Sequence, residues 1–461
     1  MGEPSSAEHV DLSSLLIDHP FGDDEVLLHG STRSWTAGEA RAEVERLRSE
    51  LAAAGVPVGA AVAVRSGGCE TVIAMTAIWR HGAVFVPVND RLPDAAVESL
   101  LERTGVAAVV VGTAVERRSG SAVHEPGAAF VLFTSGTTGE PKAIVHHHDA
   151  YLEIIDRVLG PLSAARDTAK RPSPNLIPVP MALNAGIYNA LFGLRAGAPL
   201  VLMDRFTTTE FATLVRRHEI RSTVLPPASI AMLNDDAEIS DLGPLRYVRS
   251  ITAPLSPFQA RRFTERFGVF VLNGYGQAEL GEVIGWTAAD AKAHPERIGA
   301  VGRPHPGVEV RIDAPDDRGV GELSVKPPAP PADGVVATLG DRLGADGFVR
   351  TGDLARLDDG WVWIEGRVGD LINRGGNKVF PDEVEEVLAS VVGIREAAVV
   401  GMPDDRLGEV PVAFVVGDAP DADLEAACRT HLAPYKVPVR YERIERLPRS
   451  DVGKLLRREL Q

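Results

Sequence analysis

The sequence predicts an α/β protein with largely parallel sheets and a small α+β domain at its C-terminal end. Between residues 60 and 251, short apolar runs alternate with longer amphipathic stretches, as in buried parallel strands joined by helices. From 371 to 460 the pattern becomes a compact strand–helix–strand succession of small-domain size. The length of 461 residues exceeds one ordinary hydrophobic core, so two or more domains are expected.

The elements of the first region follow from the apolar runs and from the amphipathic stretches between them. Strands are expected at 60–64, 83–88 and 107–111, and helices at 69–81 and 94–103. The same rhythm continues at 199–203, 211–218, 222–225 and 246–251.

The pattern changes after residue 305. Residues 305–325 alternate apolar and polar side chains, as half-exposed antiparallel strands do. The proline-rich run 327–334 predicts a surface loop or linker. Residues 358–360, Asp-Asp-Gly, predict a hairpin turn before a strand at 361–364. A domain boundary is expected near 367–370.

Composition excludes several classes of function. A net charge of −16 argues against a general nucleic-acid or anionic-membrane binder, because phosphate groups repel it. No apolar stretch reaches the roughly 20 residues of a membrane helix, and the N-terminal residues lack a signal-peptide pattern, so a cytoplasmic location is expected. Cys69 and Cys428 are expected to be buried free thiols in a reducing compartment.

The most informative segment is Phe-Thr-Ser-Gly-Thr-Thr-Gly-Glu-Pro-Lys at 133–142, directly after the apolar run 128–133. This order predicts a buried strand that opens into a loop rich in hydrogen-bond donors. Glycines let backbone N–H groups approach an anion, hydroxyls add donors and lysine adds a charge, so polyphosphate is the expected ligand. The spacing is not that of the Walker loop. The following His146-His147-His148 is interpreted as a helix entry, because consecutive residues seldom converge on one metal ion.

A second segment, Asn-Gly-Tyr-Gly-Gln-Ala-Glu at 273–279, follows the apolar run 269–272. A glycine-permitted turn there would bring an aromatic face and a carboxylate into one cleft. Tyr275 is a candidate for stacking on adenine, and Glu279 for holding Mg²⁺, which prefers oxygen ligands and bridges phosphates. For Tyr275 by itself, ordinary packing is the alternative.

Three further segments lie toward the C-terminus. Arg-Thr-Gly-Asp at 350–353 puts a carboxylate, Asp353, at the end of a strand, where it would accept ribose hydroxyls; a hairpin turn is the alternative. Residues 366–378 form another glycine-rich segment, which contains Arg367. Residues 447–454 end in Gly453-Lys454 on an arginine-rich tail, which would otherwise be solvated surface.

These five segments, in this order, resemble the adenylate-forming superfamily of acyl- and aryl-CoA ligases, carrier-protein adenylation domains and luciferase. The resemblance implies a large N-terminal domain of stacked sheets and helices, 1–368, and a small mobile α+β C-terminal domain, 369–461. It also implies that the carboxylate of an acid attacks the α-phosphate of Mg·ATP, giving acyl-AMP and pyrophosphate. The C-terminal domain would then turn, withdraw Lys454 and admit a thiol.

The resemblance implies three groups of site residues. The catalytic residues would be Lys454, Glu279 and Arg367, with Mg²⁺ on Glu279. Nucleotide contacts are expected from Thr134, Ser135, Gly136, Thr137, Thr138, Gly139, Lys142, Ala253, Tyr275, Gly276, Asp353 and Arg367. The acid is expected to contact Leu183, Asn184, Gly186, Ile187, Thr252, Asn273, Gly274 and Ala278. The cofactors would be ATP, Mg²⁺ and, as acceptor, CoA or the phosphopantetheine of an acyl or aryl carrier protein.

The identity of the acid rests chiefly on Asn184. Amino-acid-activating relatives carry Asp there, so an uncharged Asn favours a ring with a hydrogen-bonding substituent, as in the 2,3-dihydroxybenzoate and salicylate activating branch. Helix capping by Asn184 is the alternative. Ala278 replaces the usual Thr, Leu183 the usual His or aromatic residue, and Gly369 the usual hinge Asp or Lys.

Three interpretations of the function remain open, and they differ in the acceptor of the acyl group. A ligase that delivers the acid to a carrier protein or CoA is expected first. Leu183 also motivates an adenylating enzyme that uses a non-thiol acceptor or stops at the adenylate. A non-catalytic binding protein is disfavoured, because Lys142, Glu279, Asp353, Arg367 and Lys454 are all present.

Overall fold

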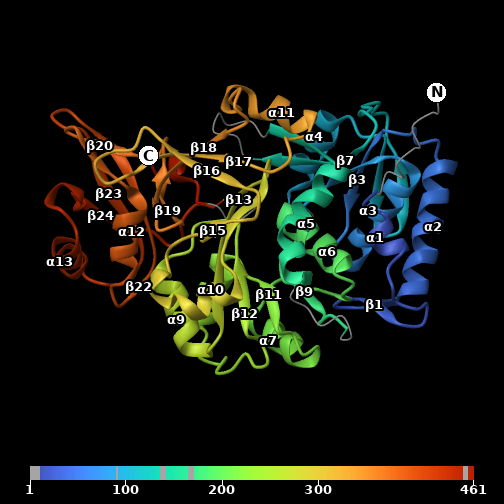
Figure 1. Ribbon diagram of the computed structural model, residues 1–461, viewed down its shortest axis with the longest axis horizontal. Helices are drawn as coiled ribbons and strands as arrows, with labels where there is room; N and C mark the ends of the chain where they lie inside the picture. The colour runs from blue at the N-terminus through green and yellow to red at the C-terminus, as the bar shows by residue number, and fades with distance from the viewer. Residues whose placement is uncertain (1–10, 90–91, 135–141, 165–170, 450–454) are drawn as a thin grey trace.

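The computed structural model describes residues 11–89, 92–134, 142–164, 171–449 and 455–461. Within these ranges the strands form four sheets, of nine, six, four and five strands (Figure 1). The two largest belong to the N-terminal two thirds of the chain, and the five-stranded sheet lies at the opposite end of the molecule from the N-terminal strands.

The nine-stranded sheet is parallel through its centre. Its spatial order is β15 (Arg303–Pro304), β14 (Gly281–Gly285), β13 (Phe270–Gln277), β12 (Tyr247–Ser250), β11 (Ser222–Val224), β9 (Asn175–Ile177), β10 (Leu200–Leu202), β1 (Val26–His29) and β2 (Ser34–Thr36). From β13 to β1 every described pairing is parallel, whereas β14, β15 and β2 pair antiparallel at the two edges.

The six-stranded sheet has the same plan of parallel centre and antiparallel edges. Its order is β6 (Ala114–Arg117), β5 (Ala108–Val111), β3 (Ala61–Arg65), β4 (Val84–Pro87), β7 (Ala128–Thr134) and β8 (Lys142–His147). The strands between β5 and β7 pair parallel. The expected strands near 60, 83 and 107 are therefore confirmed to within one or two residues.

Helices cover and separate these sheets. In chain order they are α1 (Ser14–Ile17), α2 (Ala37–Ala53), α3 (Gly68–His81), α4 (Asp94–Thr104), α5 (His148–Ala164), α6 (Asn184–Arg195), α7 (Thr208–Arg217), α8 (Pro227–Asp235), α9 (Pro257–Phe267) and α10 (Ala288–Ala293). One buried cluster joins Phe85 and Phe130 of the six-stranded sheet to Leu200 of the nine-stranded sheet through α3, α5 and α6. The two large sheets are thus stacked with helices between them.

The remaining sheets are mainly antiparallel. The four-stranded sheet contains β16 (Glu309–Asp313), β17 (Gly321–Lys326), β18 (Val349–Asp358) and β19 (Trp361–Arg367). The five-stranded sheet contains β21 (Asn377–Val379), β20 (Ile372–Arg374), β23 (Gly408–Gly417), β22 (Ile394–Asp404) and β24 (Arg440–Arg443), with α12 (Pro381–Ala389) and α13 (Asp421–His431). Buried side chains of both helices pack on this sheet as one cluster. The predicted fold class, a large α/β part and a smaller α+β part, is confirmed.

Two local expectations were confirmed and one was wrong. The proline-rich segment is irregular from 327 to 332, as expected, and α11 (Asp333–Leu339) begins at its end. Val335 and Leu339, four residues apart, bury the same helix face in a cluster with Ile144. Residues 273–277, expected as a turn, belong to β13. The hairpin at 358–360 is confirmed by positive φ at both Asp359 and Gly360.

Both cysteines are free and buried, as expected. Cys69 lies in α3, where burial and then the nearby Glu70 charge raise the pKa of its thiol to about 12. None of the helices in the described ranges has the length and apolar character needed to cross a membrane.

His146 gives a pH-dependent test of the core. Its ring stacks on Phe130 at 4.8 Å, its Nε2 is buried and has no partner among the described residues, and burial together with the neighbouring His147 lowers its pKa to about 4. Because the folded protein resists protonating this ring, stability is full above the ordinary pKa of 6.5 and is lost as pH falls toward 4. Between about pH 7 and pH 5, His146→Phe should lose about 2 kcal/mol less unfolding free energy than the parent protein, measured by urea unfolding. Equal losses in the two proteins would contradict this role of His146.

Candidate active site

Three of the predicted nucleotide contacts meet at the buried carboxylate of Asp353. Asp353 on β18 lies opposite Arg367 on β19 in the strand register, and Arg367 Nε donates to Asp353 Oδ1 at 2.8 Å. From β13, the Tyr275 hydroxyl donates to Asp353 Oδ2 at 2.6 Å. Residues from three motifs that are distant in the sequence are thereby brought into direct contact.

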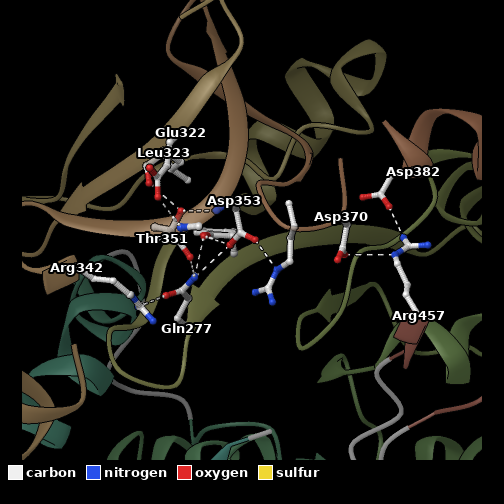
Figure 2. Close-up of polar contacts among 12 residues, drawn as sticks. Gln277, Glu322, Leu323, Arg342, Thr351, Asp353, Asp370, Asp382 and Arg457 are labelled. Atoms are coloured by element: carbon white, nitrogen blue, oxygen red, sulfur yellow. Dashed lines mark hydrogen bonds and ion pairs between the residues drawn. The ribbon is translucent and has the colours of Figure 1, made fainter. Parts of the chain in front are cut away.

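Gln277 and Thr351 extend this network, as Figure 2 shows. Gln277 Nε2 donates to Asp353 Oδ2 at 3.1 Å and to the Thr351 carbonyl at 2.8 Å. The Thr351 hydroxyl accepts the backbone N–H of Asp353 at 3.1 Å and donates to the Leu323 carbonyl at 2.8 Å. Sequence reasoning did not select Gln277, because its position in the motif is normally free to vary.

The Asp353 carboxylate therefore has little unused accepting capacity. A carboxylate offers about four acceptor positions, and Arg367, Tyr275 and Gln277 occupy three. Burial, and then the charge of Asp353, raises the pKa of the Tyr275 hydroxyl well above its usual value, so it remains a donor. Both hydroxyls of a ribose can bind Asp353 only if one of these three donors withdraws.

The place of Asp353 in its strand differs from the prediction. It lies inside β18 rather than at a strand end, and the hairpin alternative for this segment is excluded. Gly352 has a φ of +76°, a conformation that favours glycine, and the β17–β18 register shifts beside it. The irregularity that made this segment look like a turn is a bulge within a continuous strand.

The motif at 273–279 is likewise a strand for most of its length. β13 pairs parallel with β12 as far as Asn273, then antiparallel with β14 from Gly274 to Gln277. A Cβ at Gly276 would lie 2.1 Å from the carbonyl oxygen of Gly281. Gly276 is needed for this close strand approach and not for a turn, which explains why its sequence signal was misread.

Glu279, the predicted Mg²⁺ ligand, follows β13 and is largely buried. Arg342, from the 3₁₀ helix η2 (Gly340–Arg342), donates from Nη1 to Glu279 Oε1 at 3.1 Å and from Nη2 to Gln277 Oε1 at 2.8 Å (Figure 2 shows the contact with Gln277). Sequence reasoning missed Arg342, because it treated the preceding segment as a loop.

The donor set around Glu279 fits Mg²⁺. Its Oε2 has no protein partner in the described ranges, and carboxylate oxygen is the ligand type that this ion prefers. The described part of the chain contains no group of three or more acidic, histidine or cysteine side chains suited to a metal ion. A single carboxylate together with phosphate oxygens is a usual Mg²⁺ environment in nucleotide enzymes.

The phosphate-loop motif connects two paired strands. Thr134 ends β7 and lies opposite Lys142, which begins β8. Ser135, Gly136, Thr137, Thr138 and Gly139 lie outside the described residues, as does Lys454. The predicted buried strand before the loop is confirmed. Of the three histidines interpreted as a helix entry, only His148 begins α5, whereas His146 and His147 still belong to β8.

Asn184 is the first residue of α6, but its side chain does not cap the helix. The N-cap is Leu183, which is half-buried and makes no side-chain capping bond. Instead, Asn184 Oδ1 accepts the hydroxyl of buried Tyr151 at 2.7 Å. The capping alternative is therefore wrong, and the amide nitrogen of Asn184 has no protein partner among the described residues.

The neighbouring positions in α6 are occupied mainly by packing. A Cβ at Gly186 would lie 2.3 Å from the Pro180 carbonyl oxygen, so this glycine permits the helix to approach that segment. Ile187 is fully buried in the core between the large sheets. Between β12 and α9, Thr252 is exposed with a φ of +83°, and Ala253 is half-buried.

The other predicted acid contacts lie on or just after β13. Asn273 Oδ1 accepts the N–H of Gly274 at 3.1 Å, and Ala278 packs against the cluster that contains Val283 and Leu323. The predicted acid contacts and the predicted nucleotide contacts thus lie on one continuous segment of the chain.

A buried charged cluster beside this strand was not predicted. Glu282 on β14 has a side chain that is only 6% exposed, and its Oε1 accepts from Arg249 on β12 and from His305 Nε2 at 3.0 Å. Burial raises the pKa of Glu282, but the Arg249 charge and the His305 contact outweigh burial and lower it overall. The sequence carried no signal for this cluster, because its three residues are isolated in the chain and belong to none of the five motifs.

The end of the chain is fixed by Arg457, which lies in the 3₁₀ helix η4 (Arg457–Leu460). Its guanidinium binds Asp382 at 2.7 Å, Asp370 at 3.4 Å and also Glu385 (Figure 2 shows Asp370 and Asp382). Burial, and then the Glu385 charge, raises the pKa of Asp382 to about 7. The residues directly after Lys454 are therefore anchored to α12 and to the segment that follows β19.

Comparison with known families agrees with this arrangement. The AMP-binding enzyme family matches residues 19–127 and 116–330, and the AMP-binding enzyme C-terminal domain matches residues 383–454. The chain belongs to the AMP-binding enzyme family. The predicted superfamily, enzyme class of AMP-forming acid–thiol ligase, and use of ATP with Mg²⁺ are thereby confirmed.

Three relatives of this AMP-binding enzyme illustrate the range of the family. The fatty acid–[acyl-carrier-protein] ligase ScoC of Streptomyces coeruleorubidus is 29% identical over 98% of this chain and 95% of its own. The o-succinylbenzoate CoA synthetase of Bacillus subtilis, solved with an acyl-adenylate, has a TM-score of 0.83 at 25% identity, over 97% of this chain and 98% of its own. The amide bond synthetase McbA of Marinactinospora thermotolerans has a TM-score of 0.81 at 27% identity, with the same coverage.

The Asp353 network yields a direct test of nucleotide binding. Asp353→Asn should raise the KM for ATP about 10- to 100-fold, because it removes the charge that Arg367 pairs with. ATP-dependent pyrophosphate exchange measures this change. Asp358→Asn, which removes an exposed carboxylate from the end of the same strand, should leave the KM unchanged. An unaltered KM in Asp353→Asn would exclude Asp353 from nucleotide binding.

Proposed function

We propose that this AMP-binding enzyme activates a small aromatic carboxylic acid with a polar ring substituent, and passes the acyl group from AMP to the thiol of CoA or of a carrier protein. The observation that carries the proposal is the dual character of β13. Tyr275 and Gln277 on this strand contact Asp353, whereas Asn273 and Gly274, which precede them on the same strand, are the positions that we assign to the acid. One rigid strand would hold the two reactants at a fixed separation.

The chemical step joins two anions, so the enzyme must neutralise negative charge as the acid attacks the α-phosphate. We assign this role to Lys454, with Arg367 on the ribose and phosphate side. Mg²⁺ held by Glu279 and phosphate oxygens would supply further charge neutralisation at the phosphates. The thiol then attacks the acyl carbon, and AMP leaves.

The preference for a substituted ring rests on Asn184. Its carbonyl oxygen is used by Tyr151, so its amide N–H groups are the part of the side chain left to meet a substrate oxygen. An ammonium group would find no negative charge on Asn184, which disfavours α-amino acids.

The two-step cycle would require the C-terminal domain to turn about Gly369. We propose that this domain comprises residues 369–461 and the N-terminal domain residues 1–368. Apart from Gly369 and its chain neighbours, no heavy atom of the described residues lies within 4 Å of the place where a Gly369 side chain would begin, so the backbone there is uncrowded. A carrier protein as acceptor and a location in the cytoplasm belong to the same proposal.

A second candidate is an enzyme that uses an amine instead of a thiol. Leu183 replaces the residue expected to gate the thiol tunnel, and the similarity to an amide bond synthetase favours this alternative. Thioester formation with CoA or a carrier protein would exclude it.

The proposed reaction is tested by pyrophosphate exchange over benzoates, hydroxy- and aminobenzoates, heteroaromatic acids and short aliphatic acids. We expect exchange to be greatest with substituted aromatic acids. Exchange confined to aliphatic acids would overturn the proposed substrate class.

Lys454→Ala should suppress acid-dependent pyrophosphate exchange about 100- to 1,000-fold, because the charge on the attacked phosphate loses its counter-charge. Transfer from preformed acyl-AMP should change only a few-fold, since Lys454 acts in the first step. Arg458→Ala, which removes an exposed positive charge from the same tail, is the matched control. Equal loss of both half-reactions would contradict the assignment.

Asn184→Asp should shift the acid preference toward amino-bearing substrates. The aspartate keeps the oxygen that accepts from Tyr151, so the change is confined to charge and to the lost amide donor. Competition between hydroxy- and aminobenzoates in pyrophosphate exchange measures the shift. An unchanged profile would remove Asn184 from the acid site.

A further inference from the structure

The buried cluster of Glu282, Arg249 and His305 lies beside the strand that carries the predicted acid contacts. A Cβ at Gly274 would lie 3.1 Å from Glu282 Cδ and Oε1. A Cβ at Gly285 would lie 2.4 Å from Glu282 Oε1 and 3.1 Å from Arg249 Nη1. Two glycines therefore provide the space in which this carboxylate and guanidinium meet.

The hydrogen bonding of the cluster is one-sided. Glu282 Oε1 receives both Arg249 and His305, whereas Glu282 Oε2 is buried and has no partner among the described residues. Arg249 is further occupied by the Trp286 carbonyl at 3.2 Å. A buried carboxylate oxygen without a donor is costly, so its retention calls for a donor that the described protein does not supply.

Tyr188 on α6 carries a second buried polar group that lacks a hydrogen-bond partner among the described residues. Its hydroxyl is buried and unpartnered among the described residues, and its ring lies 6.4 Å from that of Tyr151, which binds Asn184. Burial raises the pKa of Tyr188, and the Glu282 charge raises it further, so the two side chains are electrostatic neighbours. Tyr188 lies on the same helix as Asn184, and Glu282 lies beside Gly274.

We propose that Glu282, assisted by Tyr188, is a specificity-determining residue that accepts a hydrogen bond from an N–H or O–H group on the acid substrate. The inference rests on the proposed function and deepens it. Glu282 would accept a hydrogen bond from a donor group on the ring, while Asn184 would donate a hydrogen bond to an oxygen on the ring. The preferred acids are hydroxy- or amino-substituted.

The same cluster disfavours other classes of acid. A second carboxylate on the substrate would meet Glu282, and Arg249 is already neutralised by that residue. A long alkyl chain would cover Glu282 Oε2 without supplying a donor, which leaves the unpaired charge buried.

The test compares hydroxybenzoates with methoxybenzoates of the same substitution pattern, because methylation removes the donor and keeps the oxygen. For the parent enzyme, the hydroxy acid should exceed the methoxy acid at least about 100-fold in kcat/KM for pyrophosphate exchange. Glu282→Gln should reduce this ratio at least about tenfold. Tyr188→Phe, which removes one hydroxyl from a buried ring, should reduce it in the same direction and serves if Glu282→Gln does not fold.

Glu43→Gln is the matched control, because Glu43 is a largely buried carboxylate paired with Arg46 on α2, outside the site. It should leave the ratio unchanged. Similar kcat/KM values for the two acids in the parent enzyme, or an unaltered ratio in both site variants, would overturn the inference while leaving acid activation intact. If no acid supports exchange, the proposed function fails, and calorimetric Kd values for the two acids then test the inference separately. Tighter binding of the hydroxy acid that is lost in Tyr188→Phe would support the inference. Equal Kd values for the two acids would overturn it.

Discussion

The close backbone contact between Gly276 of β13 and Gly281 of β14 is the constraint on which the site depends. A side chain at Gly276 would collide with the Gly281 carbonyl, so only glycine lets β13 leave β12 and continue along β14. Before this point the strand carries Asn273, Gly274 and Tyr275; after it come Gln277, Ala278 and Glu279. The contact therefore fixes, without any ligand, the spacing of the predicted acid and nucleotide contacts along this segment.

Three carboxylate–guanidinium clusters join different elements of the fold. Asp353 with Arg367 joins β18 to β19. Glu282 with Arg249 joins β12 to β14. Arg457 with Asp382 ties the chain terminus to α12. Buried ion pairs of this kind contribute little net stability, but removing one partner is strongly destabilising, so each cluster holds its elements in one arrangement.

The sequence predicted what depends on local patterns. The parallel strands near 60, 83 and 107 follow from continuous apolar runs, and the turn at 358–360 follows from Asp-Asp-Gly. The motifs also predicted Tyr275, Asp353 and Arg367 as site residues, and the Asp353 side chain contacts the other two in the structure. The strand at 273–277 was misread because a glycine required by a neighbouring backbone resembles a glycine required by a turn.

What could not be predicted depends on long-range contacts. Arg342 reaches Glu279 from η2, directly after α11, and that helix is stabilised by burial of Val335 and Leu339 against distant residues. Glu282, Arg249 and His305 have no sequence spacing in common. Their partnership exists only in the folded sheet.

The saturation of Asp353 has a consequence for turnover. Before ATP binds, Tyr275 and Gln277 already satisfy much of the carboxylate, so a nucleotide gains only the difference between new hydrogen bonds and those it replaces. If the ribose binds Asp353, as we propose, the same two side chains would return to this carboxylate as AMP departs. They would thus compete with the ribose, which would weaken nucleotide retention and favour release of AMP.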